Sequence, residues 1–149
     1  MHYPPLTITF LGTGTSSGVP MIACNCAVCS SADKKDNRLR SSIMVQSSNT
    51  TLVVDTTPDF RFQMLRSKVK KLDAVIFTHP HKDHTAGLDD VKAFNYFGNA
   101  AVQVYANELT QKALKNEFYY VFTKEKYPGI PEIELNTIDE EIFVVGDIP

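Results

Sequence analysis

The 149-residue sequence has no histidine after His84, and three of its four histidines fall between positions 79 and 84. No apolar run approaches the ~20 residues that a membrane-spanning helix needs, so we expect no membrane span. The first five residues also lack the basic start and apolar stretch of a secretory signal. These absences favour a globular protein of one domain's length, and we expect it in the cytoplasm.

Lysine and arginine are missing from residues 130–149, a stretch that carries six acidic residues. The net charge of the whole chain is only −2, so the remainder of the chain is net positive. Its basic residues concentrate in two clusters, Lys34–Arg40 and Arg61–Lys71. Such clusters can attract a phosphate-bearing substrate or RNA, but they are more often solvated faces. Charge alone therefore favours RNA binding only weakly.

Cysteine is limited to three residues, Cys24, Cys26 and Cys29. An odd number at this close spacing cannot pair fully in disulfides, and a cytoplasmic chain is expected to keep its thiols reduced. Three thiolates can occupy three corners of a zinc tetrahedron, so we expect a structural zinc site here. The alternative is a loop of plain reduced thiols.

The histidines stand in the pattern His-x-His-x-Asp-His, directly after the apolar run Ala74–Phe77. His79 and His81 alternate onto one side of an extended segment and can reach one ion, whereas Asp83 and His84 follow at a turn and can reach a second. Imidazole nitrogen and carboxylate oxygen suit zinc and similar divalent ions. The spacing predicts a two-metal hydrolytic site that generates a bridging hydroxide.

The segment Thr78–Asp89 resembles the signature of the metallo-β-lactamase superfamily of metal-dependent hydrolases. The glycine-rich run Phe10–Pro20, the cysteine group and the segment Arg38–Ser42 are similar to one branch of it. That branch holds the phosphodiesterases of phosphonate breakdown and, more distantly, the tRNA 3′-end-processing endonucleases. The resemblance implies that Asp55, at the end of an apolar strand, supports the metal-binding loop without touching metal. In related phosphodiesterases a late histidine completes the cysteine site; here His2 is the only spare candidate.

Strand-like and helix-like segments alternate along the chain, which predicts an α/β fold with a mixed sheet. Strands are expected at 6–11, 42–46, 51–54, 75–77, 102–105, 133–138 and 142–145, with residues 42–54 forming a hairpin. Helices are expected after a cap at Thr57, over Leu88–Phe97 and after a cap at Asn107. The resemblance implies an αββα sandwich, of which residues 1–149 supply a single, incomplete domain: the first half and the start of the second.

The favoured function is a metal-dependent phosphodiesterase acting on a small cyclic phosphodiester through a metal-bound hydroxide. His79, His81, Asp83 and His84 would hold two zinc or manganese ions, and Asp83 would also accept the proton of the attacking water. The same motif serves RNA 3′ ends, thioesters and lactones. Family members carry further metal ligands beyond the point that matches Pro149. The chain is therefore expected to be a fragment with little activity alone, or else a short protein that completes its site as a homodimer; a metal-binding, inactive fragment is the alternative function.

Overall fold

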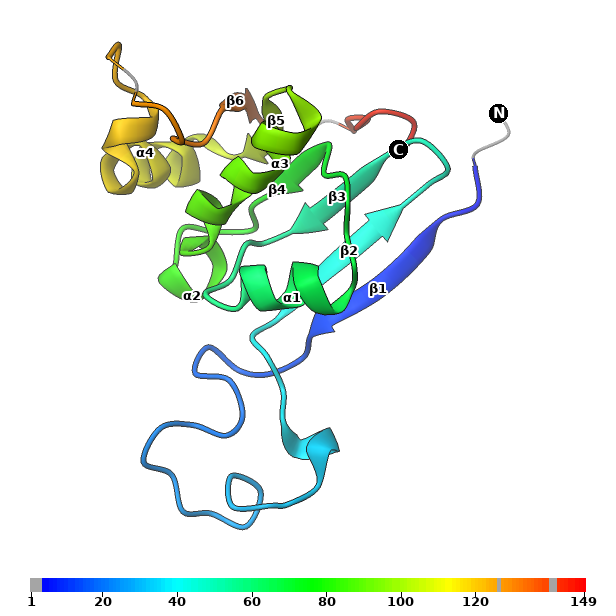
Figure 1. Ribbon diagram of the computed structural model, residues 1–149, viewed down its shortest axis with the longest axis vertical. Coiled ribbons are helices and arrows are strands. Elements are labelled where there is room, and N and C mark those ends of the chain that lie inside the picture. The colour runs from blue at the N-terminus through cyan, green and yellow to red at the C-terminus, as the bar shows by residue number, and fades with distance from the viewer. Residues whose placement is uncertain (1–3, 126, 140–141) are drawn as a thin grey trace.

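The computed structural model describes residues 4–125, 127–139 and 142–149, and in them a six-stranded sheet is the central element. In spatial order its strands are β1 (Thr7–Gly12), β2 (Ser42–Gln46), β3 (Thr51–Val54), β4 (Ala74–Ile76), β5 (Val102–Ala106) and β6 (Ile133–Thr137). The first three strands pair antiparallel, whereas β3 to β6 pair in parallel. Strands β1, β3, β4, β5 and β6 therefore end at the same edge of the sheet (Figure 1).

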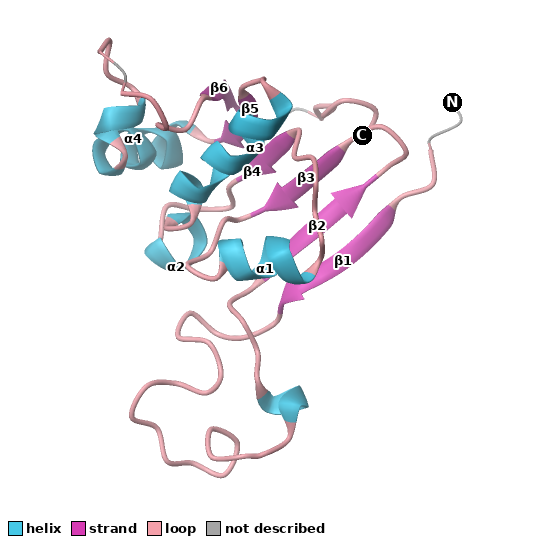
Figure 2. Ribbon diagram, in the orientation of Figure 1, coloured by secondary structure: helices cyan, strands magenta, loops and turns pink. Residues whose placement is uncertain are grey.

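The helices pack against one face of this sheet, as Figure 2 shows for α1 and α3. They are α1 (Phe60–Arg66), α2 (Lys82–Thr85), α3 (Lys92–Gly98) and α4 (Glu108–Glu117), with 3-10 turns η1 (Lys34–Asp36), η2 (Leu88–Val91) and η3 (Tyr119–Val121). Because side chains alternate along a strand, every second residue points at the helices. The main core accordingly joins the strand residues Leu11, Met44, Val53, Val75 and Val104 to the helical residues Phe60, Leu88 and Leu114.

The opposite face of the sheet is also apolar, and it is only partly covered. Leu52 and Ala74 form a second buried cluster there with Val145 and Ile148, which the C-terminal segment lays across the strands. Beyond that segment, Phe10 remains 70% exposed. A sheet that is apolar on both faces is typical of a layered α/β architecture.

The α/β class with a mixed sheet is confirmed, as are the hairpin of β2 and β3 and the cap at Asn107, whose side chain accepts from the Thr110 backbone N–H at 2.9 Å. Two local predictions are wrong. Residues 142–145 form no strand, because Gly146 turns the chain with φ +60° and leaves only a bridge between Val145 and Ile148. Helix α1 begins after Asp59, two residues later than the predicted start, although the Thr57 hydroxyl does accept the Asp59 backbone N–H as a capping side chain would.

The glycine-rich run after β1 permits a close approach of two backbones. A Cβ atom on Gly12 would lie 2.0 Å from the Arg40 carbonyl oxygen, and one on Gly14 would lie 2.6 Å from that of Arg38. The Gly14 backbone N–H is already donated to the Leu39 carbonyl at 2.7 Å. Gly12 and Gly14 therefore serve the close packing of these two segments. Within the described residues no helix is long and apolar enough to cross a bilayer.

Candidate metal centre

The histidine loop follows β4 at the edge where the parallel strands end, the usual place for ligands in open α/β sheets. It brings its imidazoles together: the ring centroids of His79 and His81 are 4.7 Å apart, and those of His79 and His84 are 4.0 Å apart. Asp83 and His84 lie on α2, where Asp83 Oδ2 approaches His84 Nε2 to 3.2 Å. All four residues that the sequence singles out in this loop are thus neighbours.

Asp55 directly follows β3 and holds the histidine loop in place from beside the adjacent strand. Its Oδ1 accepts the Thr78 backbone N–H at 2.9 Å, and its Oδ2 accepts the Thr78 hydroxyl at 2.8 Å. The same Oδ2 lies 2.7 Å from His84 Nδ1. Asp55 is buried and has φ +65°, a conformation uncommon for a residue with a side chain and concentrated at functional sites.

The hydrogen bonds of Thr78 and Asp55 fix which imidazole nitrogens carry protons. A neutral imidazole has one N–H, and Asp55 can only accept while ionised, so His84 carries its proton on Nδ1. Thr78 donates its single hydroxyl proton to Asp55, so at 2.9 Å from its oxygen His79 Nδ1 must be the donor. Nδ1 of each ring is thus engaged by a neighbour, which leaves Nε2 as the nitrogen available to a metal ion, since a neutral imidazole with its proton on Nδ1 has its lone pair there.

Sequence reasoning missed the role of Thr78 in this arrangement. It stands immediately before His79 and was visible only as a member of the motif, with no role assigned. Its usefulness depends on Asp55, which is 23 residues away in sequence and reaches it only because β3 and β4 are neighbours. No periodicity or spacing in a single sequence reports that contact.

Gly87, which follows α2, packs closely against the segment that links β3 to α1. Its backbone N–H donates to the Thr56 carbonyl at 2.7 Å, and a Cβ atom at this position would lie 2.3 Å from the Thr57 carbonyl oxygen and 2.6 Å from Phe60 Cβ. The Thr57 carbonyl oxygen is a backbone atom, and Phe60 Cβ is bonded directly to the backbone. Neither can move aside without shifting the chain that carries Asp55.

We expect Gly87→Ala to lower the free energy of unfolding by about 1–3 kcal/mol, the usual cost of overpacking. The matched control is Gly98→Ala, because nothing lies within 4 Å of a Cβ atom placed there and alanine favours the helix. Urea unfolding followed by circular dichroism measures both. Equal stability of the two variants would contradict the packing argument.

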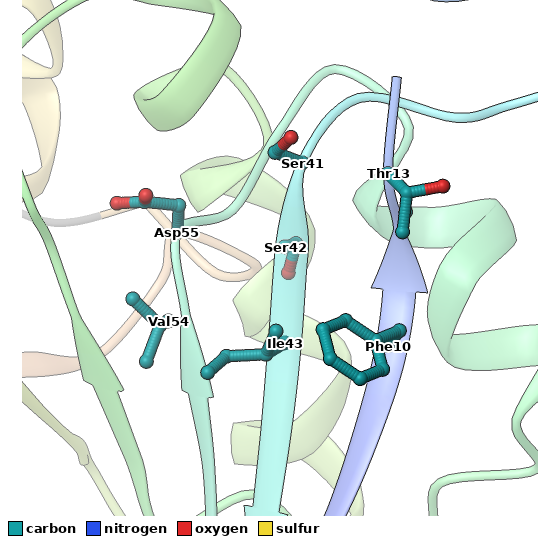
Figure 3. A pocket seen from close by; sticks show the side chains of 8 residues that line it. Phe10, Thr13, Ser41, Ser42, Ile43, Val54 and Asp55 are labelled. Atoms are coloured by element: carbon teal, nitrogen blue, oxygen red, sulfur yellow. The ribbon is translucent and has the colours of Figure 1, made fainter. Parts of the chain in front are cut away.

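An open hollow beside Asp55 extends the centre along the sheet, with a volume of about 340 Å³. Figure 3 shows Asp55 and Ser41 at its rim and the side chains of Phe10, Ile43 and Val54 beneath them. It lies on the face away from the helices. Its apolar floor and polar rim are the composition of a small-ligand site.

The three cysteines lie in the long connection between β1 and β2, where η1 is the only helix described. Their Sγ atoms all lie within 4.8 Å of one another, and no other set of three His, Cys, Asp or Glu donors in the described residues is that close. Backbone N–H groups donate to two of them, from Met21 to Cys29 Sγ at 3.4 Å and from Cys29 to Cys26 Sγ at 3.5 Å. The Cys29 donation, followed by the Cys24 contact, lowers the pKa of Cys26 to about 7. All three are free thiols. His2 lies outside the described residues.

Known proteins with similar sequences or structures were found for most of this chain. A family model described as a β-lactamase superfamily domain matches residues 50–148. A crystal structure of a diphosphatase from the PhnP family is 46% identical, covers 95% of this chain and 55% of its own, and superposes with a TM-score of 0.84. Zn²⁺-bound PqqB from Methylobacterium extorquens is 23% identical with a TM-score of 0.74, and the match covers 93% of this chain and 51% of that one.

A curated relative, an octanoyltransferase from Porphyromonas gingivalis, is 39% identical over 140 residues. The match covers 93% of this chain but 28% of that protein, so the activity for which that protein is named belongs to a polypeptide much longer than the part that matches. The chain thus spans about half the length of the similar solved structures and about a quarter of this curated relative.

Proposed function

The chain belongs to the metallo-β-lactamase superfamily, and from that membership we propose that it supplies the metal-binding loop of a phosphodiesterase. The diphosphatase at 46% identity supports hydrolysis at phosphorus. The observation that carries the proposal is the arrangement of the loop: His79 and His84 are both held through Nδ1, and a carboxylate oxygen of Asp83 lies 3.2 Å from Nε2 of His84.

The donors fit a divalent ion of zinc type. Two ligand atoms bound at about 2.0–2.1 Å to one tetrahedral ion lie roughly 3.3 Å from each other. Asp83 Oδ2 and His84 Nε2 are 3.2 Å apart, which matches that geometry closely. His79 and His81, on the extended part of the loop, would hold a second ion. If the four donors of the loop divide between two ions, three of them need not converge on one point. This agrees with the structure, in which no three donors of the described histidine loop form a group as close as the cysteines.

In the proposed reaction, bound divalent ions would polarise the phosphoryl group and make water a better nucleophile. Asp83 accepts a proton from the attacking water, because it is the carboxylate of the loop that remains partly open to solvent. Asp55 and Thr78 hold the two rings through Nδ1 and so leave Nε2 of each available to an ion. The apolar hollow beside Asp55 receives the organic part of a small cyclic phosphodiester.

The test of this function uses the full natural reading frame that contains these residues, loaded with zinc or manganese. We expect turnover of bis-p-nitrophenyl phosphate to exceed turnover of a thioester and of a lactone. Preferential hydrolysis of either carbonyl substrate would transfer the assignment to that substrate class. Cleavage of an RNA 3′ end in preference to the small diester would identify a nuclease, and no turnover of any of them would leave a metal-binding role alone.

We also propose that Cys24, Cys26 and Cys29 hold a structural zinc ion. The distances between their Sγ atoms suit three corners of a tetrahedron, and the two backbone N–H donors stabilise negative charge on sulfur. The surrounding connection has little regular structure, so a metal crosslink would stabilise it substantially.

Zinc is therefore expected to protect the three thiols from alkylation. Counting modified cysteines by mass spectrometry, with and without one equivalent of zinc, measures the protection. Cys29→Ser is the informative variant, because removing one of three ligands should abolish protection of the other two. Identical labelling of the unsubstituted chain in both conditions would show plain thiols.

A further inference from the structure

A groove between α1 and α3 lies on the helical side of the sheet, with a volume of about 550 Å³. Its floor belongs to the main core: Phe60 and Met64 are buried, and Phe94 meets Phe60 edge-on with ring centroids 6.4 Å apart. The rim is apolar too, yet it faces solvent, since Leu65 is 59% exposed and Phe97 is 83% exposed. Single exposed apolar residues are ordinary, but two that flank an apolar hollow form a continuous surface.

Positive charge surrounds this groove. Arg61, Lys68 and Lys70 line it, and none of them has an ion-pair partner in the part of the chain that the structure describes. Asp90 is the single acidic residue of the lining. Three uncompensated cations beside exposed aromatic and aliphatic groups complement a ligand that is both apolar and anionic.

The groove is separate from the histidine loop. Lys68 and Lys70 precede β4 and Phe97 precedes β5, so this end of the groove lies toward the amino ends of those strands. The histidines follow β4 at the opposite edge of the sheet. A ligand in the groove therefore need not compete with a substrate at the metal centre.

We propose that this groove docks an acidic amphipathic helix of a partner protein. The partner's apolar face lies on Phe97, Leu65 and the floor, and its carboxylates face the three cations. Both flanking helices have seven residues and so are about 10 Å long, which matches about two turns of a docked helix. The solvent-exposed rim favours a helix over a small molecule, because small-molecule sites bury most of their ligand.

A designed peptide tests the proposal without knowledge of the natural partner. The probe is a fluorescent helical peptide of about 15 residues with leucine at i, i+3, i+4 and i+7 spacing and glutamate elsewhere. We expect saturable binding by fluorescence anisotropy that weakens as salt is raised. Phe97→Ser should weaken it about tenfold or more, as for a central aromatic anchor. Lys68→Glu with Lys70→Glu should weaken it at low salt and reverse the salt dependence, because the lining then repels the acidic probe.

Two matched variants serve as controls. Phe62→Ser removes an exposed phenylalanine from α1 that does not line the groove, and Lys112→Glu reverses an exposed charge on α4; both should bind the probe as the unsubstituted chain does. Equal binding of a probe with lysine in place of glutamate, or unchanged affinity of Phe97→Ser, would overturn the proposal. So would binding of decanoate without binding of the peptide, or sedimentation showing that Phe97→Ser only dissociates self-associated chains.

Discussion

Replacing Asp83 by alanine is expected to lower metal-dependent turnover of bis-p-nitrophenyl phosphate by about 10²–10⁴-fold in the full natural reading frame. The carboxylate lies 3.2 Å from His84 Nε2 and keeps 23% of its side chain exposed, so it can contact both an ion and a water. Loss of the carboxylate would remove a ligand and the proton acceptor together. Asp55, the other carboxylate beside the imidazoles, is turned to Nδ1 of His84.

Metal content separates the two roles of Asp83. A variant that keeps its metal but loses kcat would show that the carboxylate acts on the proton, whereas loss of both would show that it acts as a ligand. Asp36→Ala is the control, since that carboxylate lies in η1 within the connection between β1 and β2. Turnover of Asp83→Ala within about twofold of the unsubstituted protein, far below the range expected for a lost proton acceptor, would contradict this part of the account.

The strands were predictable because alternation of apolar residues is a local property. Ser42–Gln46 and Thr51–Val54 alternate between the two faces of the sheet, and both were placed at their observed bounds. The strand predicted at 142–145 failed for a reason outside that window. A Cβ atom on Gly146 would lie 2.1 Å from Thr50 Oγ1, so the turn is set by contact with a residue nearly a hundred positions earlier.

The functional site shows the same contrast between features that are local in sequence and features that depend on contacts between distant residues. His79, His81, Asp83 and His84 lie within six consecutive residues, so their pattern as metal ligands can be recognised from the sequence alone. The three cysteines are likewise close both in sequence and in space. Asp55 could be placed at a strand end, but only its contacts with Thr78 and His84 reveal that it sets the proton position on the ring. Likewise the groove between α1 and α3 joins basic residues to Phe97, more than twenty-five positions further along the chain.

Substituting both His79 and His81 by alanine is expected to remove at least one equivalent of divalent metal from the chain. The two rings lie 4.7 Å apart at their centroids, and Thr78 already orients the first of them. Their removal leaves Asp83 and His84 with one carboxylate and one imidazole, too few protein ligands to retain zinc tightly. Because both side chains stand on a loop and at least partly face solvent, the fold should persist.

The cysteine site would obscure this loss, so the measurement belongs in a background with Cys24, Cys26 and Cys29 replaced by serine. In that background, elemental analysis after equilibrium dialysis against zinc compares the intact histidine loop with the His79→Ala, His81→Ala variant. The account predicts at least one equivalent of zinc for the former and at least one equivalent fewer for the latter. Equal zinc content in the two proteins would contradict the claim that this loop is a metal centre.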